Sequence, residues 1–378
     1  MKKLLKILCA AVTLCVILLS LGGCWSADEI SHKAIILGIS VDFADTPEKY
    51  LVTAQIARPS QLKASSADGE NAYINISSEG VGVQAALHGF ETQLSREIYT
   101  GHMELIIFSE EIARSGLTPV LDYFYRSSEA RFSTPVIIAE GRAADLLDIQ
   151  ADLEQMPVSS ILGTMSNQDS DIIMSGTTMG DLLREMVTEH SAVTLALFRV
   201  NGKRAAMEKA AVIKGDKMIG SLTIDQKQYE LLAGGEYDEG VQVCKIADGK
   251  VASFRIMKCV TKHNLKYENG QFSADISVNI TGQISGITFG GEEYTIRARE
   301  DLEQILRDFI TRGINDMFSA TKEINADIIG FNEMLRRKYP RDSKSLLENW
   351  DDNYRNFPIS VSVAATLTGT GAVRERVK

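Results

Sequence analysis

The stretch IRAREDLEQILRDFITRGINDMFSA, residues 296–320, has the clearest helical pattern in the chain. Its apolar residues recur at intervals of three and four, so they fall on one face of a helix. They are Leu302, Ile305, Leu306, Phe309, Ile310, Ile314 and Met317. Acidic residues near the start and arginines farther along agree with the helix dipole. The pattern predicts a long helix from about Ile296 to Ala320.

The apolar face of this helix has two interpretations. Such a face packs in a protein core, or it lies in a membrane interface or a partner's groove. Helices that lie on anionic lipid usually have Lys and Arg on the polar face, but here acidic and amide side chains dominate it. They are Glu300, Asp301, Glu303, Gln304, Asp308 and Asp316. We therefore expect the face to be core.

The residues after this helix supply the surface that it would cover. Two further helical stretches follow, near Phe331 to Lys338 and near Lys344 to Trp350, and an alternating strand runs from Ile359 to Leu367. A layered domain needs such a sheet to bury the helix face. The C-terminal part is therefore predicted to be an antiparallel sheet covered by long helices.

Upstream, residues 191–270 have the pattern of an antiparallel meander. Four turn-forming pairs separate strand-like runs: Asn201-Gly202, Gly215-Asp216, Asp248-Gly249 and Asn269-Gly270. A short helix from about Asp225 to Leu232 interrupts them, with Asp225 as the expected N-cap.

Residues 25–190 alternate between the two periodicities, which indicates an α/β or α+β domain. The expected strands are Ala34 to Val41, Tyr50 to Ala57, Ala72 to Ile76, Met103 to Phe108 and Pro135 to Ala139. The expected helices are Val83 to Leu94, Leu117 to Tyr125, Ala143 to Ile149 and Met179 to Val187.

The N-terminus has the layout of a lipoprotein signal peptide. Three lysines precede an uncharged apolar run from Ile7 to Leu21, which is short for a membrane span. The following tetrapeptide, Leu21-Gly22-Gly23-Cys24, matches the bacterial lipobox. We expect residues 1–23 to be removed and Cys24 to receive two or more acyl chains, which anchor a protein stably. The alternative is an ordinary signal peptide with a chance cysteine.

The charge of the mature chain argues against a nucleic-acid partner. Removing residues 1–23 takes three lysines and no acids, which leaves 37 basic and 50 acidic residues and a net charge of −13. Only Cys244 and Cys259 remain as free cysteines, so no disulfide framework exists. A hairpin turn at Asp248-Gly249 would pair Cys244 with Ser253, which favours two free thiols over one disulfide.

Catalytic and metal-binding signatures are not found in the sequence. Residues 80–85, Gly-Val-Gly-Val-Gln-Ala, resemble part of a dinucleotide fingerprint, but two strands precede them and N-capping explains the glycines. His102 and Glu104 have the spacing of a zinc deaminase pair, yet no Pro-Cys-x-x-Cys follows. A basic run from Arg336 to Lys344 is more typical of a solvated helix end than of a lipid or partner contact. We expect no catalytic residue, cofactor or metal.

Four blocks of sequence, taken in order, resemble the Ger(x)C family, the C subunits of spore germinant receptors. The first joins Gly23-Cys24-Trp25 to the strand Ile35 to Asp42, and the second runs from Leu94 to His102 and on to Arg126. The third, Lys214 to Gly220, is similar to a family hairpin, and the fourth holds Gly330-Phe331 and Asn349-Trp350. Two departures are Ser26-Ala27-Asp28, where the family has an Asp-Arg-Arg-like triplet, and Asn332, which replaces the second glycine of a Gly-x-Gly.

The resemblance implies an α+β chain of three consecutive mixed α/β-type domains. With the changes of pattern, we place them at residues 24–190, 191–270 and 271–378. It also implies a non-catalytic subunit of a nutrient germinant receptor, partnered by integral-membrane A and B subunits on the outer face of the spore inner membrane.

Two other classes of protein fit the sequence less well. A lipid-anchored, extracytoplasmic solute-binding protein fits the anchor and the size, but it would have two similar α/β lobes, which the meander after residue 191 argues against. An extracytoplasmic hydrolase would need a nucleophile beside a base, and no motif suggests one.

Overall fold

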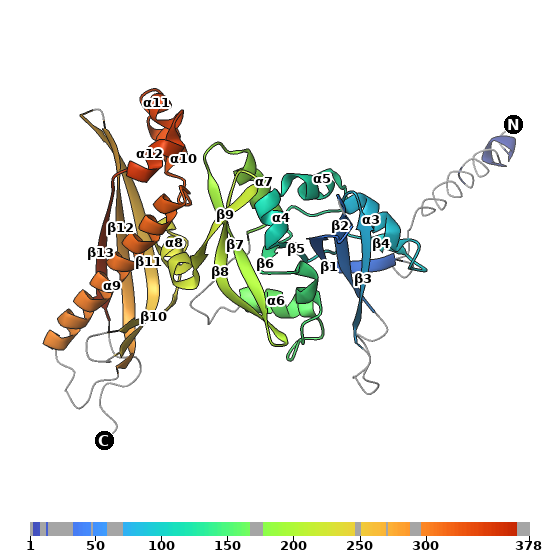
Figure 1. Ribbon diagram of the computed structural model, residues 1–378, viewed down its shortest axis with the longest axis horizontal. Coiled ribbons are helices and arrows are strands. Elements are labelled where there is room, and N and C mark those ends of the chain that lie inside the picture. Colours follow the sequence, from blue (N-terminus) through green and yellow to red (C-terminus); the bar gives the residue numbers. More distant parts are fainter. Residues whose placement is uncertain are drawn as a thin grey trace, which may run out of the picture.

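The computed structural model describes residues 3–7, 13, 33–46, 48–58, 71–166, 177–245, 251–269, 271–287 and 296–368. These residues form two β-sheets with helices on their faces, arranged side by side along the long axis (Figure 1). We call them the first unit and the second unit. The predicted α+β class is confirmed.

The first unit is a nine-stranded sheet in the order β3-β2-β1-β5-β6-β7-β8-β9, with β4 paired to β1. Its strands are β1 (Lys33–Phe43), β2 (Tyr50–Ala57), β3 (Tyr73–Gly80), β4 (Glu97–Tyr99), β5 (Leu105–Ser109), β6 (Val136–Ala139), β7 (Ala192–Asn201), β8 (Arg204–Lys214) and β9 (Lys217–Thr223). The five strands predicted before residue 140 are all present, and β4 was not predicted.

The centre of this sheet is parallel, because β1, β5, β6 and β7 all run in one direction. Buried apolar residues on one face pack against α3 (Val83–Phe90), α4 (Glu110–Ser115), α5 (Thr118–Arg126) and α7 (Met179–Val187). The other face packs against the 3-10 helix η2 (Ala143–Leu147) and against α6 (Pro157–Met165), a helix that was not predicted. Burial on both faces explains the nearly continuous apolar runs of β5 and β6.

The meander β7-β8-β9 extends the same sheet, since β7 pairs with β6. Its turns are where the sequence predicts them, and Gly202 and Gly215 have positive φ angles of 63° and 58°. A division at residue 190 thus falls between strands of one sheet. The three-domain division remains a prediction.

The second unit is a four-stranded sheet in the order β10-β11-β12-β13. Its strands are β10 (Gly240–Lys245), β11 (Val251–Glu268), β12 (Gln271–Ile287) and β13 (Ile359–Leu367). The first three are antiparallel, as predicted, but β13 is parallel to β12. The reason is the crossover between them, which contains α9 (Ile296–Glu323) and three shorter helices and brings the chain back to the end where β12 began.

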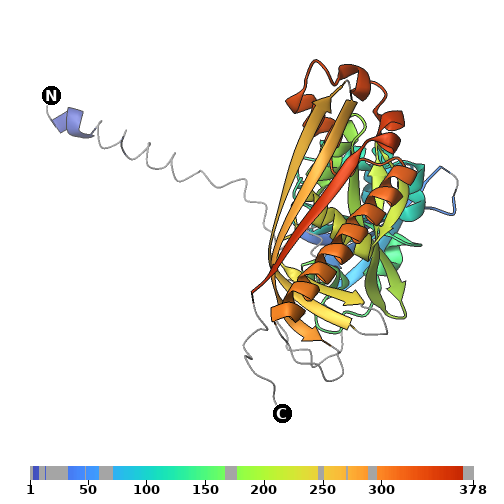
Figure 2. The same ribbon diagram turned by 90° about the vertical axis from the view of Figure 1, so that its left-hand side faces the viewer.

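Helix α9 lies across one face of the second sheet (Figure 2) and buries its apolar face there. Leu306, Ile310 and Ile314 are fully buried, whereas Ile305 and Phe309 are only partly buried at the side of the contact. The predicted core role of this face is confirmed.

Three local predictions were wrong. The N-cap of α8 (Ile224–Gly234) is Thr223, which forms a capping box with Gln226, and not Asp225. The helix expected at Lys344 to Trp350 is two helices, α11 (Lys344–Leu347) and α12 (Trp350–Asn356), after α10 (Phe331–Lys338). Cys244 pairs with Ala252 and not with Ser253. The turn at Asp248-Gly249, from which the pairing was predicted, lies outside the described residues.

The prediction of two free thiols is confirmed, with Cys244 buried in β10 and Cys259 partly buried in β11. Burial raises the pKa of both thiols, to about 12 for Cys244, so neither is a reactive thiolate at neutral pH. None of the helices in the described part of the chain is long and apolar enough to cross a bilayer.

Candidate functional site: the junction between the two units

The two sheets meet where the end of α9 and the loop after it lie against the first unit. Ala326 is fully buried in the apolar core of the first sheet, together with Leu222 and Val212. Ile324 covers Gly220 of β9 so closely that an added Cβ would lie 3.1 Å from Ile324 Cδ1. The second unit therefore contributes side chains to the core of the first.

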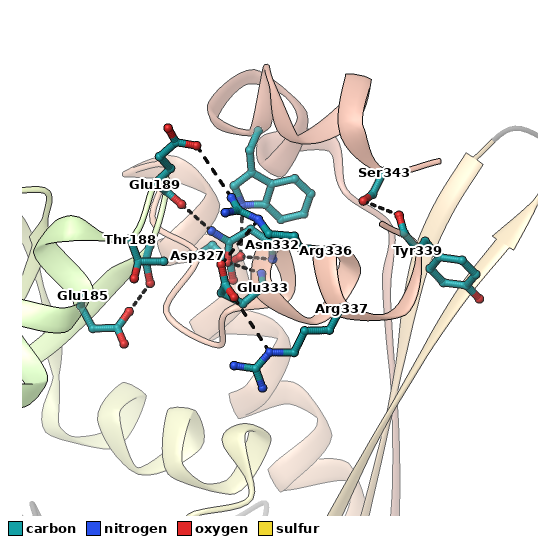
Figure 3. A network of polar contacts seen from close by, with 12 residues as sticks. Glu185, Thr188, Glu189, Asp327, Asn332, Glu333, Arg336, Arg337, Tyr339 and Ser343 are labelled. Atoms are coloured by element: carbon teal, nitrogen blue, oxygen red, sulfur yellow. Dashed lines mark hydrogen bonds and ion pairs between the residues drawn. The ribbon is translucent and has the colours of Figure 1, made fainter. Parts of the chain in front are cut away.

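Asp327 is the buried centre of this junction (Figure 3). Its Oδ1 accepts hydrogen bonds from the backbone N–H groups of Gly330 (3.0 Å) and Phe331 (3.1 Å). Its Oδ2 accepts from the Asn332 N–H (2.9 Å) and from Trp350 Nε1 (3.1 Å). One carboxylate thus satisfies the unpaired N–H groups at the start of α10 and holds α12 beside it.

Burial makes the Asp327 carboxyl group a weaker acid than usual. Loss of solvation raises the pKa of Asp327 to about 6, although its four hydrogen-bond donors act in the opposite direction. The indole that donates to it is itself buried, with its ring centroid 5.1 Å from that of Phe357. The carboxylate, the indole and the start of α10 form one rigid group.

This group is tied to the turn that follows α7. Asn332 Nδ2 donates to the backbone oxygen of Glu189 (2.8 Å), and the Arg336 guanidinium lies 3.9 Å from the Glu189 carboxylate (Figure 3). The turn belongs to the first unit and leads directly into β7. Asn332 therefore links the two units through a backbone atom and not through a charge.

A second set of links uses charge. Asp351 Oδ1, on α12, lies 2.9 Å from Lys214 Nζ and 2.9 Å from His190 Nδ1, both in the first unit. Lys214 Nζ also donates to the backbone oxygen of Asn325 (2.7 Å). Although partial burial acts to raise it, the hydrogen bonds from Lys214 and His190 hold the pKa of Asp351 below its ordinary value.

On the other side of the junction, α8 inserts a buried ion pair beneath β7. Lys227 Nζ lies 3.0 Å from Glu230 Oε1 and donates to Thr194 Oγ1 (2.8 Å), and Thr194 donates to the same Glu230 oxygen (2.9 Å). Burial raises the pKa of Glu230, and the Lys227 ammonium opposes that rise. Glu230 Oε2 has no hydrogen-bond partner among the described residues.

The junction has the properties of a mechanical connection. Its polar groups are nearly all satisfied by one another, and its acids and bases are held in ion pairs or N-terminal caps. The Thr194 hydroxyl beside Glu230 is buried, which keeps it away from any substrate in solvent. The arrangement can fix the two units relative to each other and pass a displacement between them.

The residues singled out from the sequence lie elsewhere. Cys24 and its lipobox fall outside the described residues. His102 is exposed, with its ring edge-on to Tyr99 at a centroid distance of 5.5 Å, and Glu104 is exposed two residues later. In the part of the chain that the structure describes, no three His, Cys, Asp or Glu side chains are grouped to hold a metal ion.

The glycine motif and the basic run are structural. Gly82 is the N-cap of α3, and a Cβ on Gly80 would lie 2.3 Å from the Ala86 nitrogen, so close packing requires that glycine. In the basic run, Arg336 and Arg337 pair with Glu333, and Lys338 donates to the backbone oxygen of Leu265 (2.6 Å).

Sequence reasoning missed Asp327, Lys214 and the Lys227–Glu230 pair as members of a site. One available signal was the Asp-x-x-Gly-Phe spacing at residues 327–331, in which an acid precedes a helix start and so predicts a cap. Lys227 and Glu230 did offer a local signal, because they are three residues apart on one helix. Their partners did not, since Lys214 is far along the chain from Asp351 and Thr194 is 36 residues from Glu230.

Comparisons with known proteins agree with this architecture. Residues 26–200 match the family model "Spore germination protein N-terminal domain", and residues 208–371 match "Spore germination B3/ GerAC like, C-terminal". The chain is 25% identical to spore germination protein YndF of Bacillus subtilis (strain 168), with 98% of this chain and 99% of that protein aligned. It is also 25% identical to spore germination protein A3 of that organism, with 93% of each chain covered.

A solved structure shows the same fold. The crystal structure of the GerBC protein matches with a TM-score of 0.61 and 18% identity, and the match covers 87% of this chain and 97% of that one. The two family models, taken together, extend over both sheets. The chain therefore belongs to the Ger(x)C family of spore germination proteins.

Proposed function

We propose that this protein is a lipid-anchored, non-catalytic subunit of a nutrient germinant receptor and takes part in triggering spore germination. Its lipid is carried by Cys24, on the outer face of the spore inner membrane. Its partners are the integral-membrane A and B subunits that the family resemblance implies. Residues 1–23 serve as the signal peptide.

One observation carries the proposal: the similarity to spore germination proteins covers nearly the full length of this chain and of those relatives. A partial match would support only a shared domain. The fold match to the GerBC protein supports the same conclusion for both units.

A protein of this kind works by contact. A lipid on Cys24 would confine the folded units to a thin layer beside the membrane, which raises their effective concentration near membrane-embedded partners. The buried junction then gives those partners one rigid body to act on, because Ala326 and Asp327 join the second unit to the first.

The solute-binding alternative is not favoured. It would have two similar α/β lobes, whereas the first sheet has nine strands with a parallel centre and the second has four, mostly antiparallel.

The anchor is tested by replacing Cys24 with Ala. The variant is expected to lose labelled-palmitate incorporation and processing at Gly23-Cys24, because the thiol is the acyl acceptor. Cys15→Ala, inside the apolar run, is the matched control and should be labelled like the parent. Equal labelling of the Cys24→Ala protein would refute the lipoprotein assignment.

The non-catalytic role is tested at His102 and Glu104. Alanine at both positions should leave germination at the parent level, since both side chains are exposed and no metal or proton transfer depends on them. Stoichiometric zinc in the purified parent protein, by elemental analysis, would contradict this part of the proposal.

A further inference from the structure

The parallel strands of the first unit define one edge of its sheet. Strands β1, β5, β6 and β7 run in the same direction, so their first residues lie along the same side. We call this side the starting edge. The chain arrives there from the N-terminus, because β1 begins at Lys33.

The loop that follows α5 runs along the starting edge. Its Glu129 accepts hydrogen bonds from Thr100, directly after β4, and its Thr134 donates to the backbone oxygen of Met103, two residues before β5. Pro135 then leads into β6. The loop therefore passes β4 and then the starts of β5 and β6.

Two exposed aromatic side chains occupy this loop and the helix before it. Tyr125 is 61% exposed and Phe132 is 52% exposed, and their ring centroids are 6.5 Å apart. Arg131, next to Phe132, is also exposed. Two neighbouring aromatic rings beside an arginine, open to solvent, have the composition of a membrane-interface contact.

The lipid on Cys24 limits which surface can lie against Tyr125 and Phe132. Cys24 is nine residues before Lys33, so a lipid there is held within about 30 Å of the starting edge. In Figure 1, β1, β4 and α3 lie at the end of the molecule farthest from the second unit. A bilayer that holds the Cys24 lipid is thus kept near the part of the starting edge where β1 begins beside β4.

We propose that Tyr125 and Phe132 form the contact by which the first unit rests on the membrane, with both rings in the headgroup region. The proposal builds on the lipid anchor of the proposed function. Weak insertion of two rings is effective here because the acyl chains already keep the protein at the surface. The contact fixes the orientation of the first unit relative to the bilayer.

Exposure alone does not give a side chain this placement, as Leu153 shows. Leu153 is 96% exposed, but it follows the carboxyl end of β6, and the nearby Gln150 N–H donates to Lys203 in the turn after β7. Both features place it at the opposite edge of the sheet. Leu153 is therefore a matched control: accessible to solvent, and distant from the proposed contact.

The test uses the full-length lipidated protein in phosphatidylcholine vesicles whose acyl chains carry bromine, a quencher of tryptophan emission. In a Trp25→Phe background, the remaining Trp350 is buried in the junction and gives the unquenched baseline. Phe132→Trp is expected to lose about half or more of its added emission, because an interfacial ring lies about 5–10 Å deep. Leu153→Trp should lose none.

The outcomes separate this proposal from the lipid anchor. If the protein floats with the vesicles and the emission added by Phe132→Trp is unquenched, the membrane contact is refuted while the anchor stands, and the aromatic pair is left for a protein partner. If the protein does not float, the anchor itself fails. Tyr125→Trp provides a second probe at the same contact, and circular dichroism checks that each variant keeps the parent fold.

Discussion

Two buried carboxylates in the junction are held in different ways. Asp327 is satisfied by three backbone N–H groups and the Trp350 indole, all of them uncharged donors. Glu230 faces the Lys227 ammonium and the Thr194 hydroxyl, and one of its oxygens has no partner in the described structure. Burial raises the pKa of both carboxyl groups.

The difference shows that the surrounding structure depends more on the Asp327 carboxylate than on the Glu230 carboxylate. Asp327 is the acceptor for donors that would otherwise be unsatisfied, so removing it exposes several defects at once. Glu230 and Lys227 satisfy mainly each other, so the pair can be removed together with little loss. The contrast can be tested by substitution and by pH.

The largest effect is expected for Asp327→Ala. It leaves three backbone N–H groups and an indole N–H buried without an acceptor, and each such group costs about 1–3 kcal/mol. We expect a loss of more than about 4 kcal/mol in the free energy of unfolding, measured in urea. Asp301→Ala, at an exposed acid on α9, is the control and should stay within about 0.5 kcal/mol of the parent.

The next effect concerns the ion pair. Lys227→Met should lower the unfolding free energy by about 3–5 kcal/mol, because Glu230 then remains buried without its cation. The double variant Lys227→Met with Glu230→Leu should recover most of that loss. Equal instability of the single and double variants would mean that the pair is not energetically self-contained.

The third prediction uses pH. In the folded protein the pKa of Asp327 is about 6, above the ordinary value of 3.8, so the folded state binds this proton more readily than the unfolded chain. Its contribution to stability is then largest below about pH 4, decreases as the pH rises to about 6, and is constant above. Two pKa units correspond to up to about 3 kcal/mol.

Comparison with Asp327→Asn isolates this contribution. In unfolding titrations from pH 4 to 7, the difference in stability between the parent and the variant should show this decrease, because Glu230 contributes equally to both proteins. If the two proteins have the same pH dependence over this range, Asp327 is not the group responsible.

The smallest effect is expected at the Arg336–Glu189 ion pair. Both side chains are largely exposed and 3.9 Å apart, so Arg336→Ala should change stability by less than about 1 kcal/mol. Asn332→Ala, which removes a hydrogen bond from a buried side chain to the same residue, should cost more. If Arg336→Ala cost more stability than Asn332→Ala, the ion pair and not the hydrogen bond would be the main link between the units here.

Much of the fold could be predicted because its elements carry local signals. The strand at Tyr50–Ala57 and the helices at Met179–Val187 and Phe331–Lys338 were predicted with their observed bounds. Turn residues fixed the β7–β8 and β8–β9 hairpins, since Gly202 and Gly215 adopt positive φ. At β10, the predicted pairing of Cys244 was displaced by one residue.

The sequence by itself determined the positions of most helices and strands, the core face of α9, and the family. These features depend on periodicity and on motifs read within a few residues of one another. Only the tertiary structure decided that β13 is parallel, that β7 to β9 continue the first sheet, and that Asp327 and Glu230 are buried. The reason is that burial and strand pairing depend on segments far along the chain. No local pattern specifies which distant segment will pack or pair with a given residue.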